Sequence, residues 1–315
     1  MNTQKAYRLH GYGGPEQIRL DDAPIPSPAR GEVLVAVSAV GINPFDWKIR
    51  EGYVRDVMPL QLPATLGVDF VGDVVRLGEA ASRFAIGDRV MTMSTRLGAY
   101  AETIAVDEMI LARVPEALSD IDAATLPIPA LTAWQDLHAA GEVQSGMRIL
   151  IHGASGTVGA FALQFAKAAG AYVIGTASAK NRDYVLGLGA DAVIDYHTER
   201  FEDHARDIDL VLDFVLIGGV MDTTSRSWGV LKPGGAIVSA SDPAILGNEP
   251  DGLRGYFPVI EADAHQLEMI AGLLASGRLT SKVARVFGRN ELLKAMDINQ
   301  GGDTTGRLIV DFKRS

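Results

Sequence analysis

Three glycines at three-residue spacing, Gly153, Gly156 and Gly159, stand in the segment GASGTVG, directly after an apolar run. The spacing Ala154-x-Gly156-x-x-Gly159 matches the dinucleotide fingerprint, with alanine in the first position. There a small first residue makes the tight turn, the second lets the backbone approach a pyrophosphate, and the third lets the helix pack on the strand. Free N–H groups at such a helix start attract phosphate. We therefore predict that a dinucleotide is bound by Ala154, Ser155, Gly156, Thr157 and Val158.

The neighbouring segments supply the strand–helix–strand context that this fingerprint requires. MRILIHG reads as an apolar strand, TVGAFALQFAKAAG as a helix that ends at a glycine, and AYVIGTAS as a second strand. A bare glycine pattern is equally typical of an ordinary turn, so this context carries the prediction.

The end of the second strand discriminates between the two nicotinamide cofactors. An acid there would hold the ribose 2′-hydroxyl of NADH. The sequence TASAKNR instead offers Thr176, Ser178, Lys180 and Arg182, with no acid before Asp183. Hydroxyls and cations suit a 2′-phosphate, so we predict NADPH; the alternative is that Lys180 and Arg182 are solvated residues at a helix start.

The elements around the glycine turn predict an α/β fold. The first third contains short β-branched runs broken by Gly and Pro, which is typical of a barrel-like β domain. A helical segment follows over 119–141, and after Gly146 apolar strands alternate with helices, which indicates a doubly wound parallel sheet. The tail returns to the first pattern. We predict a β-rich domain formed by residues 1–122 and 262–315, and a dinucleotide-binding domain formed by residues 123–261.

Composition excludes several other classes of protein. The 315 residues carry 39 acidic against 29 basic side chains, and the net charge of −10 argues against nucleic acid or an anionic membrane as the main partner. Cysteine is absent, so thiolate nucleophiles and cysteine-bearing zinc sites are excluded. The sequence shows no signal peptide and no apolar run long enough for a membrane span, and we expect a cytoplasmic protein.

The chain resembles the zinc-independent quinone oxidoreductases of the medium-chain dehydrogenase/reductase superfamily, and most closely their enone and alkenal reductase branch. The motifs VGINPFDWKIREG, PATLGVDFVGDVV, GASGTVG, LKPGGAIVSAS and GRLIV occur in the expected order. The resemblance covers nearly the whole chain. It implies a GroES-like catalytic domain, a Rossmann NADP-binding domain, and a nicotinamide placed between them.

Two other dehydrogenase classes do not fit. Zinc-dependent members carry a cysteine where this chain has Asn43, and the six histidines are too scattered to form a ligand set, so we predict no metal site. His152 is interpreted as a strand residue beside the turn. Short-chain reductases need a Tyr-x-x-x-Lys pair, which this sequence lacks.

A metal-free reductase must stabilise the negative charge that develops on the substrate oxygen and must then supply a proton. The resemblance implies that Lys48 reaches the ribose or the substrate oxygen and that Asn43 lies against the nicotinamide ribose. Asp46 would orient the segment. Tyr53 is a candidate proton donor, although its register differs by one residue from some relatives. The alternatives are a surface cation for Lys48 and a rim aromatic for Tyr53.

Further contacts are implied by the same resemblance. Thr132 would lie near the nicotinamide and Tyr196 near the adenosine phosphate, while Val215 belongs to a cofactor loop from Asp213 to Gly219. The segment GYFPVIEADA would form an edge strand that pairs across a two-fold axis, which predicts a homodimer.

We therefore predict an NADPH-dependent, zinc-independent oxidoreductase that reduces quinones or the C=C bond of α,β-unsaturated carbonyls. Two alternatives stay open. One is an NADPH-binding protein with little turnover, which senses the cofactor or holds it as structure. The other is an enoyl thioester reductase, which the acidic composition makes less attractive because a carrier phosphate needs a basic patch.

Overall fold

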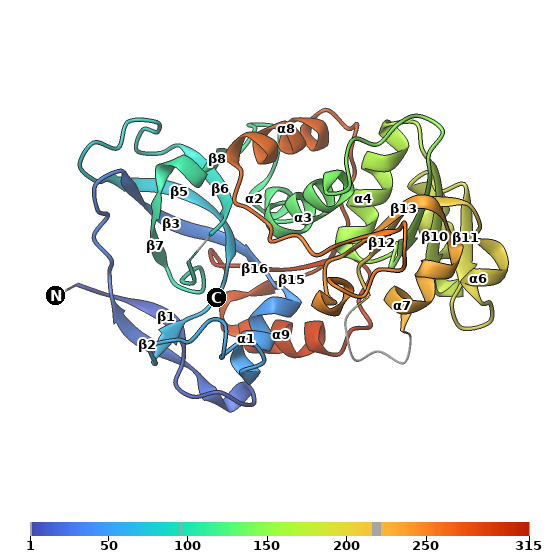
Figure 1. The fold of residues 1–315 in the computed structure, drawn as a ribbon. Coiled ribbons are helices and arrows are strands. Elements are labelled where there is room, and N and C mark those ends of the chain that lie inside the picture. The colour runs from blue at the N-terminus through green and yellow to red at the C-terminus, as the bar shows by residue number, and fades with distance from the viewer. Residues whose placement is uncertain (1, 95, 216–221, 315) are drawn as a thin grey trace. The chain divides into compact units, whose positions relative to one another are not determined.

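The computed structural model describes residues 2–94, 96–215 and 222–314, and the chain forms two compact units. The first, which we call the β-rich unit, comprises Met1–Ile128, Glu261–Arg278 and Lys282–Ser315. The second, the α/β unit, comprises Pro129–Ile260 and Leu279–Ser281. The β-rich unit is therefore built from both ends of the chain, with the α/β unit inserted in the sequence between them (Figure 1).

Two sheets form the framework of the β-rich unit. The smaller has the order β2-β1-β4, with β1 (Thr3–Leu9), β2 (Ile18–Pro24) and β4 (Ala64–Thr65). The larger has the order β15-β16-β3-β5-β6-β8, and β7 also pairs with β3. Its strands are β3 (Glu32–Gly41), β5 (Asp69–Leu77), β6 (Arg89–Met93), β7 (Thr103–Asp107), β8 (Ala112–Arg113), β15 (Val283–Gly288) and β16 (Arg307–Asp311). The helices of this unit are α1 (Pro44–Glu51), α2 (Asp120–Ala123), α8 (Ala264–Ala275) and α9 (Leu292–Gln300).

Strand β3 joins the two ends of the chain. It pairs with β5 and β7 from the N-terminal segment and, antiparallel, with β16 from the C-terminal segment, where Ile309 lies opposite Gly41. Its valines are packed in one hydrophobic core together with Phe287 and Val310 from the tail. β-Branched side chains suit such a strand because they pack well on a pleated surface.

The α/β unit contains one sheet of parallel strands in the order β11-β10-β9-β12-β13-β14. The strands are β9 (Arg148–His152), β10 (Tyr172–Ala177), β11 (Ala192–Asp195), β12 (Ile208–Asp213), β13 (Leu231–Ser239) and β14 (Arg254–Tyr256). The helices are α3 (Pro127–His138), α4 (Thr157–Ala168), α5 (Arg182–Gly187), α6 (Phe201–His204) and α7 (Thr223–Ser227). The order reverses between β9 and β12, which is where ligands bind in doubly wound sheets.

One face of this sheet carries two rows of side chains. The first, the apolar row, is buried and comprises Leu150, Ile174, Val211 and Ile237. Two residues farther along the same four strands, and hence on the same face, the side chains become polar. This polar row is also buried and comprises His152, Thr176, Asp213 and Ser239.

The long helical segment predicted over 119–141 is two helices. Ser119 begins α2 as predicted, because its hydroxyl accepts the N–H of Asp122 at 3.0 Å. The segment then breaks before Pro127, which stands first in α3 and has no N–H to donate to the preceding turn. The predicted strands and the helix after the glycine turn are confirmed, and α4 gives way to Gly170 at a φ of +83°.

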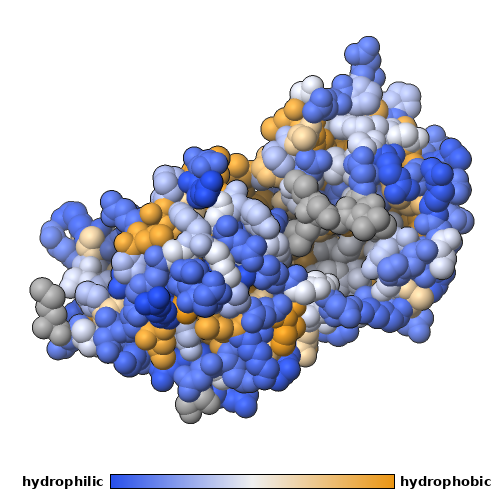
Figure 2. Space-filling view, turned by 90° about the horizontal axis from the view of Figure 1, so that it is seen from below, coloured by the Kyte–Doolittle hydropathy of each residue, from blue (hydrophilic) through white to orange (hydrophobic). Residues whose placement is uncertain are grey.

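Figure 2 shows one face of the molecule. Hydrophilic residues predominate on it and hydrophobic residues form small separate groups. Among the described residues, no helix is long and apolar enough to cross a membrane.

Candidate functional site

The turn between β9 and α4 takes its shape from Gly153. Its φ of +72° lies in the left-handed region that glycine adopts without strain. The fingerprint placed Ala154 in the turn-making position. Ala154 is instead buried and donates its N–H to the carbonyl of Thr176 at 3.1 Å. The left-handed residue is therefore Gly153, and Ala154 ties the turn to β10.

The start of α4 fits a pyrophosphate. A Cβ on Gly159 would lie 2.3 Å from the carbonyl oxygen of Gly153, so only glycine lets α4 approach β9 this closely. Gly156 is the N-cap and has no side chain to occupy the amides of the first turn, and the residues Thr157 and Val158 are partly exposed. Uncapped amides at the start of a twelve-residue helix bind anions.

The end of β10 has the predicted hydroxyls and no acid. Thr176 is buried in the polar row, and the hydroxyl of Ser178 accepts a bond from the side-chain amide of Asn181 at 3.3 Å. Lys180 is exposed in the short turn after the strand. Arg182 instead donates from Nη1 to the carbonyl of Val193 at 2.9 Å. Ser178 and Lys180 therefore stay predicted contacts, whereas the guanidinium of Arg182 is already bonded to β11.

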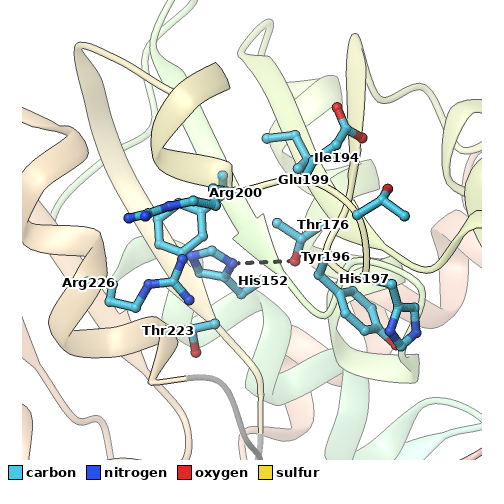
Figure 3. A pocket seen from close by; sticks show the side chains of 11 residues that line it. His152, Thr176, Ile194, Tyr196, His197, Glu199, Arg200, Thr223 and Arg226 are labelled. Atoms are coloured by element: carbon cyan, nitrogen blue, oxygen red, sulfur yellow. Dashed lines mark hydrogen bonds between the residues drawn. The ribbon is translucent and has the colours of Figure 1, made fainter.

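A pocket of about 250 Å³ opens at the carboxyl ends of β9, β10 and β11 (Figure 3). It is lined by His152, Thr176, Ile194, Tyr196, His197, Thr198, Glu199, Arg200, Phe201, Thr223 and Arg226. Figure 3 shows the guanidinium groups of Arg200 and Arg226 on one side and the rings of Tyr196 and His197 on the other. The volume suits a flat heterocycle rather than a whole dinucleotide. The predicted residues Thr176 and Tyr196 are brought together here.

His152 connects the glycine turn to α7 through an ordered chain of hydrogen bonds. Ser227 donates its hydroxyl proton to the carbonyl of Thr223 at 2.6 Å, so it accepts from Nε2 of His152 at 2.9 Å. Nδ1 of His152 then accepts from the hydroxyl of Thr176 at 3.3 Å. Thr176 in turn accepts the N–H of Gly153 at 3.2 Å. Burial lowers the pKa of His152 to about 4, so the ring is neutral at pH 7. A neutral ring is what this series of hydrogen bonds requires, because Nδ1 must accept a hydrogen bond.

Asp213 fixes the other side of the polar row. Its Oδ2 accepts the hydroxyl protons of Thr223 and Thr224, each at 2.7 Å, and its Oδ1 accepts the N–H of Val215 at 3.0 Å. Val215 is thereby held at the carboxyl end of β12, which is where the sequence placed it. Residues 216–219 of the predicted cofactor loop lie outside the described residues.

Helix α3 carries Thr132 and, one turn later, Asp136. Thr132 is nearly buried, at 8% exposure. Asp136 is fully buried, and neither carboxylate oxygen has a hydrogen-bond partner among the described residues. Burial raises the pKa of Asp136 to about 7, because the charged form loses its hydration.

In the β-rich unit, α1 carries Lys48, and Tyr53 follows directly after the end of this helix. Lys48 is half-buried, and this burial lowers its pKa. Its Nζ lies 6.0 Å from the ring centroid of Trp47, and the ring of Tyr53 meets the same indole edge-on at 6.1 Å. Tyr53 is 69% exposed and follows Gly52, whose φ of +83° ends the helix. Lys48 and Tyr53 therefore flank one aromatic ring.

A buried polar network fixes the start of α1. The backbone N–H of Asn43 and the hydroxyl of Tyr100 both donate to Oδ2 of Asp46, at 2.8 and 2.7 Å. The side-chain amide of Asn43 donates to Oδ1 of Asp69 at 3.1 Å, and Arg307 binds the other oxygen of Asp69 at 2.5 Å. The expectation that Asp46 orients this segment therefore has a direct geometric basis. Burial raises the pKa of Asp46 to about 7.

No metal cluster is found within the described part of the chain, where no group of three or more His, Asp or Glu side chains is placed to hold an ion. Asn43, at the position where zinc-dependent dehydrogenases have a ligand, spends its amide on Asp69 and on the carbonyl of Gly41. The side-chain amide of Asn43 is thus used in hydrogen bonds within the protein.

Sequence reasoning missed several residues of the pocket and its supports. His152 was interpreted only as a strand residue, and Arg200, Arg226, Thr223 and Ser227 were not considered. A usable signal existed in the strands, because each of four apolar runs turns polar two residues after a buried aliphatic side chain. No pattern in the sequence pointed to the two arginines.

Comparison with known families assigns both halves of the chain. A family model described as the alcohol dehydrogenase GroES-like domain matches residues 29–116. A second, described as zinc-binding dehydrogenase, matches residues 188–310.

Individual proteins agree with these matches. The chain is 32% identical over 326 residues to the quinone oxidoreductase of Mus musculus, covering 97% of both chains. It is 40% identical over 202 residues to a chloroplastic quinone-oxidoreductase homologue of Spinacia oleracea, and this match spans 61% of each chain. Among solved structures, the quinone oxidoreductase of Coxiella burnetii superposes with a TM-score of 0.92 at 32% identity, over 98% of this chain and 99% of that one. The Escherichia coli quinone oxidoreductase complexed with NADPH gives 0.87 at 28% identity, with the same coverage.

Proposed function

The chain belongs to the quinone oxidoreductase branch of the medium-chain dehydrogenase/reductase superfamily, and from this premise we propose an NADPH-dependent, zinc-independent reductase of quinones or α,β-unsaturated carbonyls. The observation that carries the proposal is the end of β10. There Thr176 and Ser178 stand beside the uncapped start of α4, and neither β10 nor the turn after it supplies the carboxylate that would bind a ribose 2′-hydroxyl. The Escherichia coli relative, whose structure was solved in complex with NADPH, supports this choice of cofactor.

The α/β unit is proposed as the cofactor-binding part. The amides of Thr157 and Val158 would hold the pyrophosphate, and the pocket beside them would take the adenine between Ile194 and Phe201. Thr132 and Val215 are proposed to border the nicotinamide half. When bound, NADPH supplies a hydride; the protein supplies binding, orientation and electrostatics.

The β-rich unit is proposed as the catalytic part. In the described residues, no carboxylate lies within salt-bridge distance of Lys48, so its ammonium charge is not already neutralised. A half-buried cation stabilises the negative charge that develops on a substrate oxygen better than a solvated one, because water screens it less. The exposed hydroxyl of Tyr53 is proposed as the proton donor. The network of Asn43, Asp46 and Asp69 would hold α1, and with it Lys48, in one position.

A homodimer is part of the proposal. Strand β14 is the last strand of its sheet and ends at Tyr256, so only the first two residues of the expected strand GYFPVIEADA are extended. Its short outer edge could pair with a second copy. Light scattering on the purified protein tests this, and a single monomer mass at micromolar concentration would contradict it. The cytoplasmic location stays a prediction, since the spinach relative is named chloroplastic.

The decisive experiment follows the oxidation of NADPH and NADH under anaerobic conditions, with a simple enone and 1,4-benzoquinone as parallel acceptors. Turnover of either acceptor with NADPH supports the proposal and tells the two substrate classes apart. Tight NADPH binding without turnover across a broad acceptor panel would replace it with a cofactor-binding role. Faster turnover with NADH would overturn the choice of cofactor.

A further inference from the structure

Arg200 occupies the N-cap position of a helix, where arginine is disfavoured. It is the N-cap of α6, a place that favours Ser, Thr, Asp or Asn because their oxygen atoms accept the free amides of the first turn. Arginine has no acceptor, and here it makes no capping bond. When a side chain breaks a local rule in this way and borders a pocket, a role in binding is the natural explanation.

The carboxylates near Arg200 are engaged elsewhere. Glu202 binds Arg226 through both oxygens at 2.7 Å, whereas Arg200 reaches Glu202 through one nitrogen at 3.5 Å. Glu199 accepts the N–H of Asp195 at 3.0 Å and faces His204 at 3.3 Å. A contact of 3.5 Å is longer than a charge-assisted hydrogen bond. The side chain of Arg200, which is 73% exposed, therefore retains donors for an anion.

The pocket that Arg200 borders lies next to the end of β10. Ala177 pairs in register with Asp195, so Ser178 and Tyr196 come directly after the ends of two neighbouring strands. The substituent at the ribose 2′ position is read at the end of this second strand in dinucleotide folds. Tyr196 and Arg200 both line the same pocket, so an anion at its mouth meets a phenol and a guanidinium.

We propose that Arg200 is a specificity-determining residue whose guanidinium binds the ribose 2′-phosphate that distinguishes NADPH from NADH. This inference rests on the proposed function and adds to it the residue that precedes α6. Arginine suits the task because its planar fork meets two phosphate oxygens at once. Arg226 is less suited to this role, since both oxygens of Glu202 already pair with its guanidinium and the ring of Phe201 holds it in place.

Two probes test the proposal without turnover. Adenosine 2′,5′-bisphosphate and adenosine 5′-monophosphate differ by the 2′-phosphate alone, and calorimetry gives the affinity of the wild type and of each variant for both. Arg200→Gln should lower the affinity for the bisphosphate by about tenfold or more and the affinity for the monophosphate by less than about twofold. Arg206→Gln is the matched control, because Arg206 precedes β12 at the opposite, amino end of the sheet, and it should change neither.

A second variant separates binding from folding. Arg200→Asp places a good capping residue before α6, so its melting temperature should equal or exceed that of the wild type, while the preference for the bisphosphate is lost.

Each outcome has one reading. Loss of the preference in both Arg200 variants, with intact melting curves, supports the proposal. An unchanged preference, or equal weakening of both probes, overturns it, the latter because Arg200 would then contact a group that both probes share, such as the adenine or the 5′-phosphate. If wild-type protein binds neither the bisphosphate nor NADPH, the proposed function itself fails.

Discussion

Asn43 and Asp69 are joined by a hydrogen bond of 3.1 Å from Nδ2 to Oδ1, and both side chains are buried. Through this bond the residue that begins α1 is fixed to the first residue of β5, and Arg307 of β16 binds the same carboxylate. Segments from both ends of the chain therefore meet where the helix of Lys48 starts.

Replacing Asn43 by alanine should lower the free energy of unfolding by about 1–3 kcal/mol, because the buried carboxylate of Asp69 loses one of its donors. Chemical denaturation measures the change. Asn248→Ala is the matched control, since it removes an exposed amide-to-carbonyl bond and should cost less than about 1 kcal/mol. Equal losses in the two variants would show that the buried network does not hold α1.

Asp136 should make the protein less stable as pH rises. Its pKa is raised to about 7 in the folded state against roughly 4 when unfolded, so folding favours the protonated form. The contribution of Asp136 to the free energy of unfolding is largest below pH 4 and is lost as the pH rises toward 7. The loss is about 1.4 kcal/mol for each pH unit between the unfolded and folded pKa values. Asp136→Leu should therefore raise the melting temperature more at pH 8 than at pH 5. Exposed Glu142→Gln serves as control, and a pH-independent gain would contradict the assignment.

Asp46 should also make the protein less stable as pH rises, but its carboxylate accepts a hydrogen bond from Tyr100. Burial raises its pKa to about 7, while the hydroxyl of Tyr100 opposes the shift by stabilising the carboxylate. Tyr100→Phe should move the pKa of Asp46 higher still and steepen the loss of stability between pH 5 and 8. Denaturation across that range measures it, and Asp46→Asn in the same background should remove the difference between the two slopes.

Lys48→Ala should lower turnover by about a hundredfold or more while weakening NADPH binding far less, because its proposed role is to stabilise charge on the substrate oxygen. Lys48→Arg, which keeps the charge, should recover part of the rate. Lys294→Ala removes a surface cation paired with Glu291 and serves as control. Unchanged turnover in Lys48→Ala would remove the residue from the mechanism.

Replacing Ser178 by alanine and Lys180 by glutamine together should reduce the ratio of NADPH to NADH efficiency, because both flank the end of β10. Steady-state kinetics with both cofactors checks it. If the ratio stays constant in this double variant and falls in Arg200→Gln, Arg200 and not the end of β10 would set the preference for NADPH.

Local pattern predicted most of the fold. Gly-rich turns and apolar runs located β9, α4 and β10, because these elements follow from periodicity and from the chain's need for glycine at one turn. The break before Pro127 was missed, since apolar spacing continues across it. The pocket could not be predicted, because the arginines and His152 come together only when β9, β11, α6 and α7 pack.

The pairing of β16 with β3 also fixes an order of events during synthesis. Once Tyr256 has emerged from the ribosome, every strand of the α/β unit is available for pairing. The large sheet of the β-rich unit still lacks β16 until residues 307–311 emerge. Until then Asp69 has no Arg307, and β3 keeps an open edge. The nascent chain can thus complete the parallel sheet of the α/β unit first, and a chain terminated before residue 307 would leave the large sheet of the β-rich unit without β16.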